Sequence, residues 1–116
     1  MTVREYLKKV AKNEFGIRVA VAEYVLENTS SDEEAKLLLD DICTNGCASG
    51  VVTNMIYYED THAFFDGHYG EIMELREQYE YDPPYDTDYK NHMAWFAFEE
   101  RAHELREEVE DLEIEE

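Results

Sequence analysis

Six apolar residues near the end of the chain advance by alternating steps of three and four positions: Trp95, Phe98, Ala102, Leu105, Val109 and Leu112. This heptad spacing places an apolar stripe, which we call the seam, along one side of a long helix. The stripe has to be covered, either by neighbouring helices of the same chain or by a second copy. The spacing therefore predicts a long C-terminal helix and leaves a homodimer through the seam open.

Two capping boxes indicate where other helices start. Thr2 is followed three positions later by Glu5, and Ser31 is followed by Glu34. In such a box each side chain accepts a hydrogen bond from a backbone N–H that the first helical turn leaves free. Apolar residues recur at helical spacing after both boxes, and Asn45-Gly46 is a typical helix end.

Residues 17–27 fit two structures. Ile17, Val19 and Val21 alternate as in a strand, whereas Ile17, Val21 and Val25 fit one face of a helix. We expect a helix, because no partner strand is evident nearby.

The second half of the chain contains clear interruptions. Another apolar stretch opens at Ser49, and Asp60 or Thr61 is expected to cap a helix in which Gly67 and Gly70 favour a kink or break. Two prolines then enforce a loop over 81–86, so the last helix is expected to start at Asp86 or Thr87. Together the patterns predict an all-α fold, a compact bundle of about five helices in a single domain over residues 1–116, with a long acidic C-terminal helix.

The charge of the chain is strongly negative and unevenly distributed. There are 29 acidic and 10 basic residues, a formal net charge of −19 at pH 7. Residues 1–20 hold five basic and two acidic residues, residues 71–88 hold seven acids and one arginine, and residues 99–116 hold ten acids and two arginines. Such charge bears on partners more than on fold. It disfavours direct nucleic-acid binding, because phosphate repels carboxylate, and it favours a protein that imitates the charge of nucleic acid.

The bulk sequence also limits the compartment. No run of about 18 apolar residues is present to span a membrane, and the charged N-terminus lacks the pattern of a signal peptide. Cys43 and Cys47 are too few for a disulfide framework or for a zinc site, which needs about four ligands. We therefore expect reduced cysteines and a cytoplasmic protein.

Two Glu-x-x-His pairs, Glu59 with His62 and Glu100 with His103, raise the alternative of a di-metal helical bundle. Such pairs arise easily by chance in a chain this acidic. If the seam faces the core, Glu100 and His103 point outward, away from a core metal site. We therefore expect no metal, no cofactor and no catalytic residue.

Two segments stand out as partner-binding surfaces. The loop from Glu80 to Tyr89 alternates tyrosines with acids, and tyrosine gives a large contact area at little cost in conformational entropy. In a helix, residues 99–116 would carry one net charge per roughly 3.4 Å, which matches the charge spacing along one DNA strand. Because a duplex has two strands, a second acidic row is required, and residues 71–88 are the candidate.

Three stretches resemble a family of small proteins of unknown function from phages and other mobile elements. They are Asn-Gly-Cys-Ala-Ser-Gly at 45–50, Tyr-Tyr-Glu-Asp-Thr-His-Ala-Phe-Phe at 57–65 and Ala-Phe-Glu-Glu at 97–100. The resemblance implies that setting and no catalytic residue. In size, acidity and helical character the chain is also similar to phage DNA-mimic antirestriction proteins and to some anti-CRISPR proteins.

The leading hypothesis is a phage-type, non-enzymatic inhibitor whose carboxylates block a basic DNA- or RNA-binding surface of a host defence complex in the host cytoplasm. The expected partner-binding residues are Glu74, Glu77, Glu80, Tyr81, Asp82, Tyr85, Asp86, Glu99, Glu100, Glu104, Glu107, Glu108 and Asp111. The alternative is an acidic scaffold module that dimerises through the seam, and a di-metal enzyme is the third hypothesis.

Overall fold

A computed structural model describes residues 1–45, 58–83 and 88–112, which form six α-helices and no strand. The helices are α1 (Val3–Asn13), α2 (Ile17–Glu27), α3 (Asp32–Asn45), α5 (Tyr58–Gly67), α6 (Tyr69–Tyr79) and α7 (Tyr89–Val109). The predicted all-α fold is confirmed, and residues 17–27 are helical rather than extended. The apolar stretch that opens at Ser49 lies outside the described residues.

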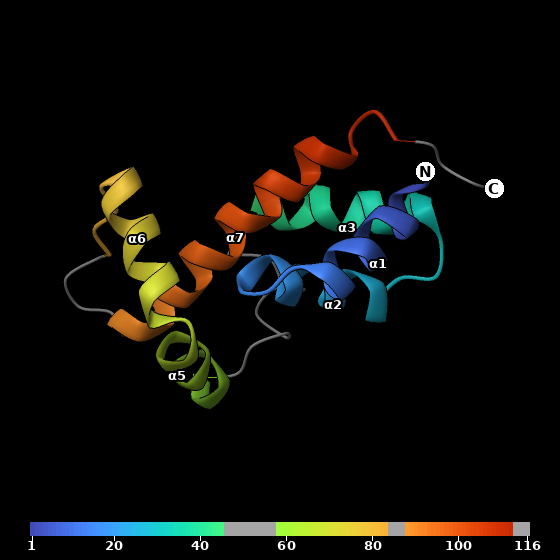
Figure 1. Ribbon diagram of the computed structural model, residues 1–116. Helices are drawn as coiled ribbons and strands as arrows, with labels where there is room; N and C mark the ends of the chain where they lie inside the picture. The colour runs from blue at the N-terminus through green and yellow to red at the C-terminus, as the bar shows by residue number, and fades with distance from the viewer. Residues whose placement is uncertain (46–57, 84–87, 113–116) are drawn as a thin grey trace.

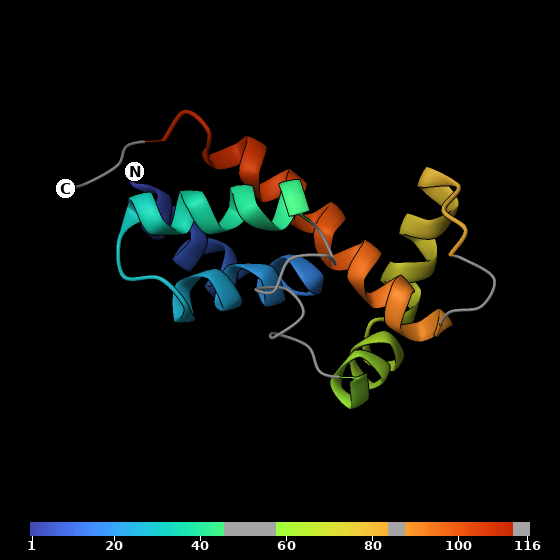
Figure 2. The same ribbon diagram turned by 180° about the vertical axis from the view of Figure 1, so that it is seen from behind.

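Helix α7 is the structural centre of the molecule. It contacts α2, α3, α5 and α6, while α1 packs mainly on α2. Figures 1 and 2 show α1, α2 and α3 gathered around the C-terminal half of α7, and α5 and α6 around its N-terminal part. The long helix therefore connects two groups of shorter helices, and the molecule is elongated, with extents of 46 × 27 × 23 Å.

The seam residues within α7 form a central part of the apolar core, whereas Leu112, the last predicted seam residue, lies beyond the end of α7 at Val109 and is only partly buried. Phe98, Ala102, Leu105 and Val109 are fully buried, and Trp95 is 8% exposed. Burying a large apolar side chain contributes about 1.5–3 kcal/mol, so this stripe accounts for much of the helix packing. Because helices of the same chain cover these side chains, the seam is an intramolecular contact, and in this fold a second copy has no access to it.

The two capping boxes form to different extents. In the first, the Glu5 N–H donates to the Thr2 hydroxyl and the Thr2 N–H donates to the Glu5 carboxylate, both at 3.2 Å. In the second, the Glu34 N–H donates to the Ser31 hydroxyl at 3.1 Å, but the Glu34 carboxylate accepts from the Ser30 N–H, one residue earlier than expected.

Two predicted helix starts were wrong. Helix α5 begins at Tyr58, ahead of the predicted caps Asp60 and Thr61. Helix α7 is capped by Asp88, whose carboxylate accepts from the Asn91 N–H at 3.1 Å, and not by Asp86 or Thr87. Aspartate and threonine are both good N-cap residues, so the sequence alone did not select among Asp86, Thr87 and Asp88.

The break predicted near Gly67 and Gly70 is confirmed. Helix α5 ends at Gly67 and α6 begins at Tyr69, with His68 between them. This interruption divides what would be one helix into two and adds to the expected number of helices.

Candidate functional site

Two arginines gather acidic side chains on one side of α7, and the first is Arg18 of α2. Its guanidinium lies 2.7 Å from the Glu14 carboxylate, 3.2 Å from Glu104 and 2.6 Å from Glu108. The Tyr6 hydroxyl also donates a hydrogen bond to Glu108. The hydrogen bonds from Arg18 hold the pKa of Glu108 below its usual value.

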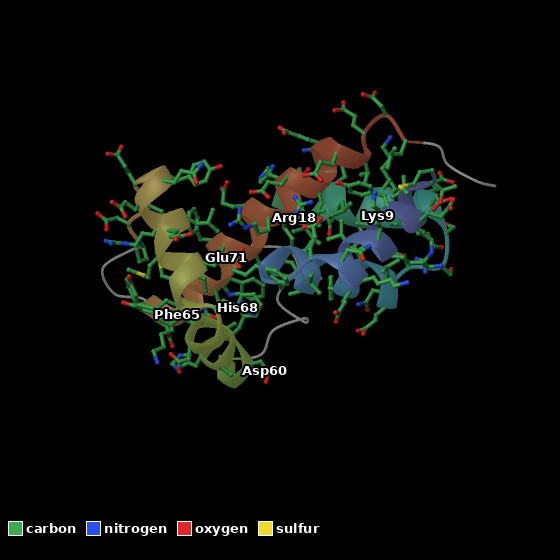
Figure 3. The ribbon with its side chains drawn as sticks, viewed as in Figure 1. Lys9, Arg18, Asp60, Phe65, His68 and Glu71 are labelled. Carbon is green, nitrogen blue, oxygen red and sulfur yellow. The ribbon has the colours of Figure 1, made fainter. Side chains whose placement is uncertain are left out.

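Arg101 of α7 forms the second half of this network. Its guanidinium lies 2.7 Å from the Glu71 carboxylate and 2.5 Å from Glu104, so Glu104 is shared by both arginines. The Glu71 carboxylate also accepts a hydrogen bond from the Ile17 N–H at 3.1 Å. Figure 3 shows Arg18 and Glu71 approaching α7 from α2 and α6. We call Arg18, Arg101 and their four carboxylates the arginine network.

The arginine network pairs two of the predicted partner-binding acids with arginines of the same chain. Glu104 and Glu108 form intramolecular ion pairs that connect helices, although their side chains stay 33% and 35% exposed. Glu99 also differs from a fully solvated acid, because partial burial raises its pKa and His103 lies 3.9 Å away. Sequence patterns did not predict the network, because some of its partners are far apart in the chain. Arg18 and Glu108 are separated by 90 residues.

Six of the remaining predicted acids form no ion pair with any described residue. They lie on two helices and just beyond them, and Glu100 alone among them is partly buried: Glu74, Glu77, Glu80, Glu100, Glu107 and Asp111. We call these six side chains the unpaired acids. Their charge is therefore available to a partner.

Helix α6 and the C-terminal half of α7, which carry the described acids of the two acidic segments, do not run side by side along their length. Helices α6 and α7 are joined near the start of α6 by the 2.7 Å contact between Glu71 and Arg101. Beyond that contact α6 and the C-terminal half of α7 diverge, as Figures 1 and 2 both show. The unpaired acids consequently lie on two diverging helices instead of the two parallel rows of a nucleic-acid duplex.

The tyrosine loop is more closely packed at its start than the sequence indicated. The Tyr81 ring stacks flat on Phe96, with ring centroids 4.2 Å apart and an interplanar angle of 4°. Asp82 pairs with Arg76 at 3.1 Å. Tyr85 and Asp86 lie outside the described residues, so their predicted role stays a prediction.

The described residues considered for metal binding do not converge, and the side chain of Glu59 lies outside the described part of the chain. Within residues 1–45, 58–83 and 88–112, no group of three or more His, Cys, Asp or Glu side chains could hold a metal ion. The His103 side chain is 44% exposed, and His62 contacts the α7 cap Asp88 at 2.6 Å. Burial raises the pKa of the Cys43 thiol to about 11, which disfavours the reactive thiolate.

The fold and its surface thus define an all-α protein with an arginine network that joins α2, α6 and α7 and with diverging acidic helices. The chain belongs to a family described as a domain of unknown function (DUF7222), whose model matches residues 5–111. Neither the curated proteins nor the solved structures contain a match to this chain. None of the described helices is both long enough and apolar enough to cross a membrane.

Proposed function

We propose that this protein is a phage-type, non-enzymatic inhibitor that binds a basic DNA- or RNA-binding surface of a host defence complex in the host cytoplasm. The observation that supports this proposal is the set of six unpaired acids on and beside α6 and α7. A carboxylate without an internal partner can accept charge-assisted hydrogen bonds from lysine and arginine side chains of another protein.

The arginine network supports the same proposal in a different way. It fixes α6 and the C-terminal half of α7 relative to α2 through Glu71, Glu104 and Glu108. Acids held on rigid helices bind a complementary basic surface with less loss of conformational entropy than acids on a flexible tail. The internal ion pairs thus position the external charges.

The inhibition mechanism is competitive exclusion of nucleic acid. Diverging helices would place negative charge at separate points of a basic groove, so the imitation is of phosphate charge and not of duplex shape. A net charge of −19 also accelerates association with a basic partner, an effect that salt screens.

The two other hypotheses lack a supporting observation. A scaffold that dimerises through the seam would need side chains that are buried within one chain, such as Phe98 and Leu105. A di-metal enzyme would need a cluster of ligands, and the described part of the chain holds none. Neither is carried forward as a second proposal.

The proposal is tested by expressing the chain in bacterial strains that each carry one defined defence system, either a restriction enzyme or a CRISPR complex. Phage plating efficiency should recover in at least one strain. The affinity for that purified complex should then fall at least tenfold between about 50 and about 200 mM salt. Failure to relieve any system, or an affinity that salt leaves unchanged, would contradict the proposal.

A further inference from the structure

A cavity of about 440 Å³ lies at the C-terminal end of α6. It is lined by Met73, Arg76, Glu77, Glu80, Tyr81 and Asp82. The volume is within the range of sites that hold small ligands or single side chains. Neither the arginine network nor the packing of the seam uses this cavity.

The walls of the cavity continue into an aromatic surface. Tyr81 stacks on Phe96, and the half-exposed Tyr79 contacts Phe96 edge to face at 6.3 Å. On the other side, the Tyr89 hydroxyl contacts the Met73 sulfur at 3.8 Å, and Tyr89 is 41% exposed. Exposed tyrosines around a depression are typical of protein-binding surfaces.

One guanidinium group, that of Arg76, already lines the cavity. Arg76 pairs with Asp82 at 3.1 Å, and its Nε atom is buried with no hydrogen-bond partner among the described residues. Glu77 and Glu80 are exposed and form no ion pair within the described chain. Because Arg76 pairs with Asp82, the carboxylates of Glu77 and Glu80 at the rim have no cationic partner within the described chain.

Glu80, which carries one of these carboxylates, has an unusual backbone conformation. Its φ is 51°, in the left-handed region where glycine is the common residue at a helix end. A side chain in this region is strained relative to glycine, because its Cβ atom approaches the following carbonyl oxygen. Despite this backbone conformation, the residue at the rim carries a charged side chain.

We propose that this cavity binds an arginine side chain of the basic partner. The proposal rests on the proposed function for the identity of the partner, but the cavity itself is tested separately. A guanidinium is planar, stacks on aromatic rings and pairs with carboxylates through two parallel hydrogen bonds. A lysine ammonium lacks that planar fork, so the aromatic wall and the two free carboxylates together favour arginine.

The test uses two fluorescent peptides of equal length and charge, one rich in arginine and one rich in lysine. Anisotropy should show tighter binding of the arginine peptide, and the Met73 methyl resonance should shift on its addition. The double variant E77Q/E80Q should weaken arginine-peptide binding about tenfold, because two charge-assisted hydrogen bonds are lost. The matched control E23Q/E27Q removes two exposed acids of α2 and should change the affinity little.

Equal affinity for the two peptides, or equal losses in the two double variants, would show general charge attraction and overturn the cavity assignment. This result is distinguishable from failure of the proposed function. If the chain inhibits a defence complex and E77Q/E80Q inhibits equally well, the cavity proposal fails alone. If the cavity prefers the arginine peptide but no defence system is relieved, the proposed function fails alone.

Discussion

The carboxylate of Glu71 accepts a hydrogen bond from the backbone N–H of Ile17, the first residue of α2, at 3.1 Å. The preceding residue, Gly16, has no side chain to cap this helix, so the cap comes from a residue 54 positions later in the chain. The same carboxylate pairs with Arg101 at 2.7 Å. One side chain therefore joins α2, α6 and α7.

Replacing Glu71 should separate its two roles. Glu71→Ala removes both the helix cap and the ion pair, and we expect it to lower the free energy of unfolding by about 1–2 kcal/mol. Glu71→Gln retains an oxygen that can accept from the Ile17 N–H, so it should lose clearly less. Urea unfolding followed by circular dichroism measures both changes, and equal losses would show that the cap contributes nothing.

Gly16 should not tolerate a side chain. Its φ is 92°, and a Cβ atom there would lie 2.5 Å from the Glu71 Oε1 atom. We expect Gly16→Ala to destabilise the fold by about 1–3 kcal/mol. Gly70 is a matched control, because it lies in α6 and a Cβ there meets no atom within 4 Å. Gly70→Ala should stabilise by about 0.5–1 kcal/mol, and thermal unfolding showing shifts of the same sign would contradict this account.

Glu108 should make stability depend on pH in the acid range. Arg18 holds the folded-state pKa of Glu108 below the ordinary value of 4.5. Its stabilisation is therefore fully present above that ordinary value and is lost as the pH falls through the folded-state pKa. We expect Glu108→Gln to lower the free energy of unfolding by about 0.5–1 kcal/mol at neutral pH, with the difference from wild type shrinking in acid. Denaturant unfolding at a series of pH values measures this, and a difference independent of pH would contradict it.

Glu99 should behave in the opposite sense. Burial raises its folded-state pKa, so the folded chain binds this proton more readily than the unfolded chain does. Ionised Glu99 then opposes folding as the pH rises through this window, and Glu99→Gln should raise stability at neutral pH by about 0.5 kcal/mol. The gain should vanish below the unfolded-state pKa. A loss of stability at neutral pH, measured by urea unfolding, would show that the contact with His103 outweighs burial.

Much of the fold could be predicted from local sequence patterns. The seam from Trp95 to Val109, the first capping box and the break at Gly67 depend on spacing within a few residues, and each is confirmed. The helix ends at Val109, before the last predicted seam residue, Leu112. The start of α7 was missed because Asp86, Thr87 and Asp88 are all good caps. Which of them is used depends on packing, including the contact between Asp88 and His62 of α5.

The site could be predicted only in part. The sequence identified where acids are dense, but it did not show which of them are free. Glu104 and Glu108 look equivalent to Glu107 in the sequence, yet Arg18 binds both from α2. That distinction arises from contacts between distant segments, and so does the stacking of Tyr81 on Phe96.

The central claim is that the unpaired acids on α6 and α7 bind a basic surface, and a matched pair of charge reversals tests it most directly. The variant E74K/E77K/E107K reverses three of these acids, and E23K/E27K/E33K reverses three exposed acids of α2 and α3 that also form no described ion pair. Both change the net charge equally, and similar melting temperatures should confirm that both fold.

The measurement is inhibition of nucleic-acid binding by the purified defence complex identified in the plating assay. We predict that E74K/E77K/E107K needs at least about tenfold more protein for half-maximal inhibition, because like charges then face the basic surface. The E23K/E27K/E33K variant should stay close to wild type. Equal losses of inhibition in the two variants would contradict the account, since they would show that total charge acts without regard to position.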